Sequence, residues 1–146
     1  MKALALLLIA SCGPAHLPSQ LTITPSDEAT AQALRVVSAV NATAAATLIR
    51  IGDRGVTIEM CGPECGSYAD GHITVSPLCD RGRDSIAVAM THEIGHAFGL
   101  KHSPDPSSIM FQNLSRAFTV DYAAQSLIDE LVAHNAVLLP PNEAIP

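Results

Sequence analysis

The chain has 146 residues, a length that allows one compact domain with a short appendage and excludes two domains of ordinary size. It contains no Trp, two Tyr and three Phe, so its core must be built mainly from Ala, Val, Leu and Ile. A formal charge of −6, with eight basic residues that form no cluster, argues against electrostatic binding of nucleic acid.

The N-terminal segment has the pattern of an export signal. Lys2 precedes the apolar run 3–10, which is far shorter than the roughly 20 apolar residues that span a bilayer as a helix. Ile9-Ala10-Ser11-Cys12 ends this run with small residues before a cysteine, and it resembles the lipobox of bacterial lipoproteins. The resemblance implies cleavage before Cys12 and lipid on that residue.

This signal divides the chain into three parts. Residues 1–11 are expected to be the signal peptide, residues 12–23 a lipidated tether, and residues 24–146 the folded domain, within which the tail 136–146 has no assigned role. The mature protein is expected on the bacterial cell envelope, with the outer membrane or cell surface favoured. A conventional signal peptide followed by an ordinary Cys12 is the alternative.

The first half of the domain alternates between strand and helix patterns. A short strand is expected over 21–24, and then a helix from Pro25 to about Asn41, with Thr24 as its cap and Pro25 at its first position. Its inner face is the set of apolar residues at three- and four-residue spacing, namely Ala29, Ala33, Val36, Val37, Val40 and Ala44.

Three further strands are expected next, with a break before the last of them. Residues 48–51 and 56–60 are rich in branched apolar side chains and flank a glycine-bounded turn, so both are expected to be strands. The segment 61–70 contains two glycines and a proline and is not expected to continue a strand. Alternation resumes in a third strand near a sheet edge, comprising His72, Ile73, Thr74, Val75 and Ser76.

Two helices are expected in the second half. The first is capped by Asp84 or Ser85 and ends at Gly99. After a loop rich in proline and serine, the last helix begins at Thr119 or Asp121 and ends near Asn135. Its inner face is expected to contain Ala124, Leu127, Ile128, Leu131 and Val132.

Three cysteines lie inside the domain, and an exported protein can form disulfides. Cys61, Cys65 and Cys79 allow one bridge in three ways, with one thiol left over, and the pairing stays open at this point. A structural zinc site formed by these cysteines and His72 is the alternative, although zinc ligands are usually more tightly paired in sequence.

A metal-binding pattern stands on the helix that ends at Gly99. His92 and His96 are four residues apart, so their imidazoles project from one helix face, and Glu93 beside them can accept a proton without being a ligand. Gly99 allows the left-handed backbone that turns the chain back and brings His102 to the same ion. Three ligands leave a fourth position open, as in catalytic zinc sites.

The pattern HExxHxxGxxH over residues 92–102 resembles the metzincin metallopeptidases. His102-Ser103 and the following Ser107-Ser108-Ile109-Met110 are similar to the matrixin branch. This resemblance implies an α+β fold, with a twisted, mostly-β sheet of about three to five strands, three helices and a methionine turn after the active-site helix. It also implies that Met110 forms an apolar floor beneath the metal and that residues 72–76 hold an extended substrate.

The chain departs from many matrixins in ways that affect its metal content and regulation. Phe111 stands where many matrixins have Tyr, and no histidine-rich loop precedes the active-site helix. We therefore expect one catalytic zinc ion and no structural zinc or calcium. Cys61-Gly62-Pro63 faintly resembles an inhibitory cysteine motif but lies inside the domain, so it is expected to be a loop.

The sequence thus predicts a monomeric zinc endopeptidase that hydrolyses polypeptides. Glu93 is expected to take a proton from the attacking water and to pass it to the leaving amine. The loop 109–115 is expected to line the side-chain pocket. Two alternatives keep the metal site: a non-catalytic protein that captures peptides, and a zinc hydrolase acting on a non-protein substrate.

Overall fold

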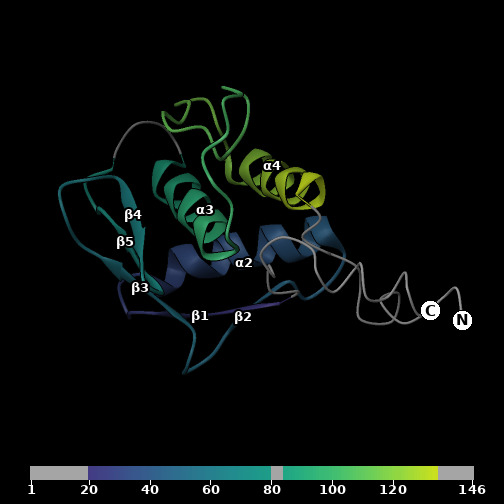
Figure 1. The fold of residues 1–146 in the computed structure, drawn as a ribbon. Coiled ribbons are helices and arrows are strands. Elements are labelled where there is room, and N and C mark those ends of the chain that lie inside the picture. The colour runs from purple at the N-terminus through teal and green to yellow at the C-terminus, as the bar shows by residue number, and fades with distance from the viewer. Residues whose placement is uncertain (1–19, 80–83, 135–146) are drawn as a thin grey trace, which may run out of the picture.

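A five-stranded sheet with three helices gathered on one of its faces makes up the computed structural model, which describes residues 20–79 and 84–134 (Figure 1). The α+β class expected from the sequence is confirmed. The elements in chain order are β1 (Leu21–Pro25), α2 (Thr30–Ala44), β2 (Ile49–Ile51), β3 (Val56–Met60), β4 (Gly66–Ala69), β5 (His72–Val75), α3 (Ser85–Ala97) and α4 (Val120–Ala133). The predicted lipidation residue Cys12 and the tail 136–146 lie outside the described residues.

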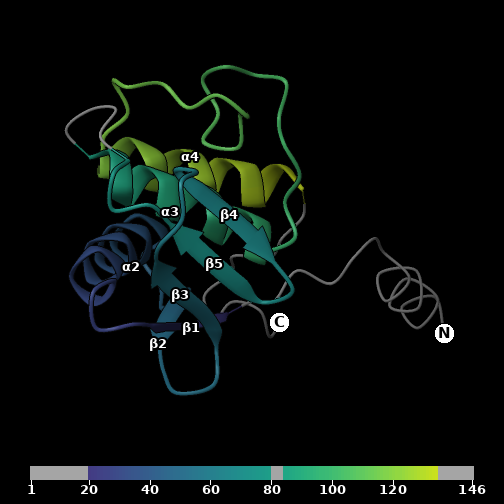
Figure 2. The ribbon, with the colours of Figure 1, turned by 90° about the vertical axis from the view of Figure 1, so that its left-hand side faces the viewer.

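The strand order in the sheet is β2-β1-β3-β5-β4. The first four strands in this order are parallel, and β4 is antiparallel to β5. Helix α3 packs on β4 and β5, and α4 packs against α3 and α2 (Figure 2). In the part of the chain that the structure describes, none of the helices combines the length and apolar character that crossing a bilayer would require.

The chain crosses over β1 between β2 and β3, so these two consecutive strands lie on opposite sides of it. Thr24 holds the crossing in place: its hydroxyl donates to the Gly52 carbonyl at 2.6 Å and accepts from the Gly55 amide at 2.8 Å. A Cβ atom at Gly55 would collide with the Thr22 carbonyl and would lie 2.7 Å from the Ile23 nitrogen. Glycine is therefore required where the loop passes over the strand.

Helix α2 begins later than the sequence pattern predicts. Thr24 and Pro25 belong to β1, and the helix begins at Thr30. The prediction that Thr24 caps this helix is wrong, because the Thr24 side chain forms hydrogen bonds to the loop that crosses β1 instead. Leu21 and Ile23, within the strand expected over 21–24, are buried in the sheet.

The asparagine near the end of α2 fastens that helix to the sheet. The Asn41 side-chain oxygen accepts from the amides of Leu48 and Ile49, each at 2.9 Å, and its nitrogen donates to the Ile49 carbonyl at 2.8 Å. The helix ends at Ala45, whose left-handed φ of 52° reverses the chain toward β2.

The segment 61–70 contains a strand that the sequence pattern did not predict. Gly62 and Pro63 lie before the strand, which begins at Gly66. β4 then forms a hairpin with β5. Asp70 and Gly71 connect the two strands with φ values of 48° and 77°, the positive values that a two-residue type I′ turn requires. Residues 72–76 were expected near a sheet edge, and β5 is the second strand from it; β5 is paired on both sides, so β4 and not β5 is the edge strand.

One carboxylate links the three helices. Asp84 precedes α3, accepts from the Arg35 guanidinium of α2 at 2.8 Å and accepts from the Val120 amide of α4 at 3.0 Å. Helix α4 is capped by Thr119, as expected, through a bond from the Tyr122 amide at 3.1 Å. Val132 was expected to face inward but is 60% exposed, because the buried face of α4 is formed by Ala123, Ala124, Leu127 and Leu131.

Replacing Gly55 with Ala should destabilise the fold by about 1–3 kcal/mol, because the new methyl group has no space above β1. Denaturant unfolding followed by circular dichroism measures this loss. Gly52→Ala is the matched control in the same loop, since its Cβ meets only the Thr22 methyl group at 3.0 Å. Equal unfolding midpoints for the two variants would contradict the crowding argument.

Candidate metal centre and cleft

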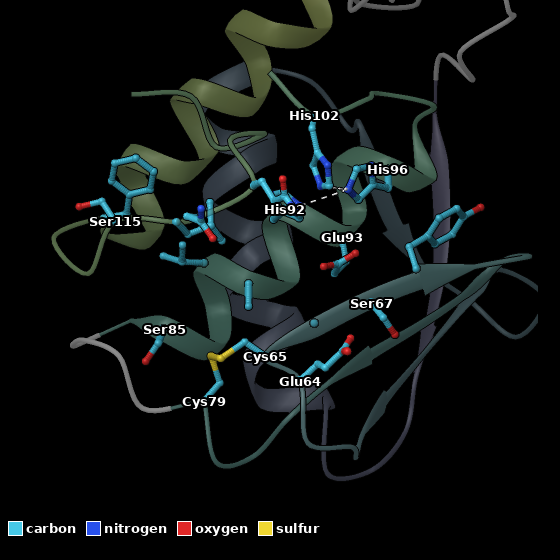
Figure 3. Close-up of a pocket in the computed structure, with 18 of the residues that line it drawn as sticks. Glu64, Cys65, Ser67, Cys79, Ser85, His92, Glu93, His96, His102 and Ser115 are labelled. Atoms are coloured by element: carbon cyan, nitrogen blue, oxygen red, sulfur yellow. Dashed lines mark hydrogen bonds between the residues drawn. A yellow bond between two sulfur atoms is a disulfide. The ribbon is translucent and has the colours of Figure 1, made fainter. Parts of the chain in front are cut away.

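Helix α3 presents the first two histidines and the glutamate of the metal-binding pattern. His92 and Glu93 are 5% and 6% exposed, and His96 is half-buried one turn further along. The helix ends at Ala97, and Gly99 adopts a φ of 92°, a conformation that L-residues rarely adopt. The chain turns back at this point, so His102 lies beside the helix histidines (Figure 3).

The three imidazoles point their Nε2 atoms toward one point. The Nε2 atom of His96 lies 3.1 Å from that of His92 and 3.2 Å from that of His102. Two nitrogens held tetrahedrally by one zinc ion at about 2.0–2.1 Å would lie roughly 3.3–3.4 Å apart. The observed spacing therefore fits a single ion of this size. Among the described residues, these three histidines form the one group of potential ligands that could hold a metal.

Hydrogen bonds on the far side of two rings determine which nitrogen is free. The Nδ1 atom of His92 donates to the Ile109 carbonyl at 2.6 Å, and that of His96 donates to the Leu100 carbonyl at 2.7 Å. A carbonyl can only accept, so Nδ1 carries the proton in each neutral ring and Nε2 carries a lone pair. Two lone pairs that face each other at 3.1 Å repel, and a shared cation removes that repulsion.

Burial keeps these rings in the form that binds metal. The pKa of His92 is lowered to about 4, mainly by desolvation and also by the neighbouring His96 and His102, against the opposing effect of the Ile109 bond. Desolvation likewise lowers the pKa of His96. A lower pKa means less competition between protons and a metal ion for the same lone pair. The donor set therefore fits zinc, which favours imidazole nitrogen.

The chain after His102 folds beneath the ligands. Met110 is fully buried, and its carbonyl accepts from the Ser103 amide at 2.9 Å. A Cβ atom at Gly95 would collide with the Met110 sulfur and would lie 3.1 Å from its terminal carbon. Met110 thus packs against α3 between the two histidine turns, as an apolar residue beneath the ligand set.

Helix α4 supports this turn through two serines. The Ser126 hydroxyl accepts from the Ile109 amide at 2.8 Å. Ser108 donates to the Glu130 carboxylate at 2.6 Å, and its hydroxyl accepts from the Met110 amide at 3.0 Å. Because the Ile109 carbonyl accepts from His92, α4 supports the orientation of a ligand ring through this one residue.

Glu93 faces the cleft beside the histidines. The pKa of its carboxyl group is raised to about 7, mainly by desolvation and also by the nearby Glu64 carboxylate. In the metal-free protein this group can therefore gain or lose a proton near neutral pH, which suits a general base. Figure 3 shows the carboxylate below the three rings and above β4.

A cleft of about 690 Å³ opens in front of these groups, within the range of small-molecule and peptide sites. One wall is the start of β4, including Gly66 and Ser67. The opposite wall is the loop 112–116 with Phe118, and Val88 and Ala89 of α3 also line the space. The predicted pocket loop 109–115 is therefore correct in part, because Ile109 and Met110 are buried beneath the ligands.

A disulfide borders the same cleft. Cys65 pairs with Cys79, and both cysteines line the cavity, whereas Cys61 is exposed and unpaired. This pairing removes two thiols from the alternative zinc site with His72. The His72 ring instead contacts Thr57 and Glu59 of the adjacent strand.

The sequence pattern missed the wall formed by β4. The predicted substrate strand 72–76 does not line the cleft, whereas residues 63–68 do. The signal that could have identified β4 is Asp70-Gly71, because this dipeptide between two alternating segments is a strong hairpin signal. The sequence does not predict that Gly66 lies beside Glu93, because this proximity depends on how α3 packs on the sheet.

A model of the matrixin family matches residues 69–131. The match begins at the β4–β5 hairpin and includes the three histidines, Glu93, Met110 and most of α4. The resemblance to matrixins is thereby confirmed over this part of the chain. The match supports metallopeptidase activity, and the family implies zinc, with which the cluster of three histidines is consistent.

Replacing Ser126 with Ala should weaken zinc binding by about 10- to 100-fold, because Ile109, whose carbonyl orients His92, loses the hydrogen bond from its amide to α4. Competition with a chromogenic chelator measures the dissociation constant. Gln125→Ala is the matched control, since Gln125 is exposed on the same helix and bonds only to Asp129. Identical affinities in the two variants would show that α4 does not act on the ligand set.

Proposed function

From the matrixin match over residues 69–131, we propose that this protein is a zinc endopeptidase that cleaves extended polypeptides at the cleft between β4 and the loop 112–116. One observation carries the proposal: three imidazole lone pairs converge on one point, and a buried carboxylate lies beside them at the wall of an open cleft. A closed structural metal site would have no such cleft.

The ligands and the base have separate roles. His92, His96 and His102 would hold the zinc ion, which when bound polarises a carbonyl group and makes water a better nucleophile. Glu93 accepts the proton of the attacking water on a carboxylate oxygen and then delivers it to the nitrogen of the leaving amine. Burial favours this exchange, because it raises the pKa of Glu93 toward that of a neutral-pH base.

The edge strand β4 offers a binding surface for the substrate main chain. Within the described residues β4 pairs with β5 alone, so its other edge offers main-chain amide and carbonyl groups along residues 66–68 next to Glu93. An extended peptide can add to such an edge as a further strand. We assign this role to β4 in place of residues 72–76, because β5 has no free edge.

The pocket beyond the base would accept a substrate side chain. Its apolar lining comes from Val88, Ala89, Leu114 and Phe118. The loop that carries Leu114 follows the methionine turn directly, so its position depends on the buried Ile109 and Met110. Side-chain preference would thus be determined by a segment that also supports the metal ligands.

Replacing Glu93 with Ala should leave zinc stoichiometry unchanged and lower kcat for peptide cleavage by at least about 100-fold, because the proton acceptor is lost. Elemental analysis and cleavage of a quenched fluorescent peptide library measure the two quantities. Glu28→Ala, at an exposed position before α2, is the control. A variant that retains full activity would reject the assignment, and a wild-type protein that binds zinc without cleaving any peptide would reject endopeptidase function.

We also propose that the protein acts at the bacterial cell envelope as a lipoprotein. The support is the sequence around Cys12, where a charged residue, a short apolar run and small residues precede the cysteine. Several acyl chains on one residue would hold the domain at a membrane surface, since a single chain binds only marginally. The formation of a disulfide between Cys65 and Cys79 is compatible with an exported location.

In bacterial cells grown with an alkyne-labelled fatty acid, the full-length protein should incorporate the label and fractionate with membranes. Cys12→Ser should abolish both properties, because the acceptor thiol is absent. Cys61→Ser, at an exposed cysteine inside the domain, is the control and should behave like the wild type. Equal labelling of the Cys12→Ser variant would refute lipid attachment at this residue.

A further inference from the structure

The first residue of β4 lies directly against the Glu93 side chain. A Cβ atom at Gly66 would lie 2.7 Å from the Glu93 Oε1 atom, 2.9 Å from its Cγ and 3.2 Å from its Cδ. Real Cβ atoms essentially never approach other heavy atoms closer than 3.0 Å, so any other residue here would displace the carboxylate or the strand.

The backbone of Gly66 does not itself require glycine. The glycines with positive φ in the described part of the chain are Gly62, Gly71 and Gly99, and Gly66 is not among them. A glycine inside a strand weakens it, and commonly marks a place where another group approaches closely. Here the approaching group is the side chain of the proposed base.

No polar group of the described residues fixes the Glu93 carboxylate. None of them donates a hydrogen bond to it; the residue is only 6% exposed, and its carboxylate oxygens reach the solvent of the cleft. Its neighbour Glu64 is an anion and repels it. The direction of the carboxylate must therefore come from packing, and the Gly66 main chain is a wall that touches it.

That wall is held firmly in place. Gly66 pairs with Val75 in the sheet, and the carbonyl of Cys65 accepts from the Ser76 amide at 3.2 Å. The disulfide from Cys65 to Cys79 fastens the chain immediately before Gly66 (Figure 3). A displacement is therefore easier for the Glu93 side chain than for the strand.

We propose that Gly66 is a positioning residue for Glu93: its missing side chain leaves the space that the carboxylate occupies, and its main chain directs that carboxylate toward the metal ligands. The inference rests on the proposed function, because it assigns Glu93 as the base. Gly66 acts through Glu93 and takes no part in proton transfer.

A double-mutant cycle between Gly66→Ala and Glu93→Asp tests the proposal. Gly66→Ala should lower kcat on the order of 100-fold with little change in KM, as expected for a misplaced base, while zinc stoichiometry stays at the wild-type value. In the Glu93→Asp background the same substitution should cost far less, because the shorter side chain withdraws from the new methyl group. Ala69→Ser, which adds one heavy atom at an exposed site outside the cleft, is the control.

A second readout uses the metal-free protein and needs no activity. Thermal unfolding should show that Gly66→Ala lowers the midpoint in the wild-type background and lowers it less in the Glu93→Asp background, since the crowding is relieved. Coupling in both measurements supports the positioning role. Coupling in stability alone, or equal losses of kcat in both backgrounds, would overturn it while peptide cleavage by the wild type still stands. A zinc-loaded wild type that cleaves no peptide would instead overturn the proposed function, and the positioning role with it.

Discussion

The hydrogen bond from the His92 ring to the Ile109 carbonyl is the interaction on which the metal centre depends. It joins the active-site helix to the turn beneath it and leaves the lone pair of the opposite ring nitrogen facing the other two histidines. The Ser126 hydroxyl accepts from the amide of the same residue, Ile109, so the last helix supports the ligand rings without supplying one of them. Helix α3, the turn after His102 and helix α4 thus meet at one residue, Ile109.

The second requirement is a carboxylate that is buried but reachable. Glu93 lies between the cation site and an acidic neighbour, inside a wall that offers it no hydrogen bond from the described residues. Such a group is expensive to ionise before a cation is present and becomes easier to ionise once one is. Metal loading and readiness of the base are therefore expected to be linked by electrostatics.

The sequence predicts the site better than the sheet, for physical reasons. His92, His96 and Gly99 belong to one helix and its end, where spacing determines direction, and these local features are readable from the chain. The position of β1 between β2 and β3 depends on tertiary pairing, and so does the use of Thr24 as a support for the crossing loop in place of a helix cap. The strand β4 was not predicted because Gly62 and Pro63 indicated a loop in this segment, although the sequence contains a hairpin-turn signal at Asp70-Gly71.

The passage of the chain over β1 restricts how the protein can be shortened. β1 is the first described element, yet it lies inside the sheet with neighbours on both sides and a loop fastened across it. A proteolytic cut within Leu21–Pro25 would thus remove an interior strand and deprive both β2 and β3 of their partner. Any maturation of the N-terminus that preserves the enzyme must therefore stop before Leu21.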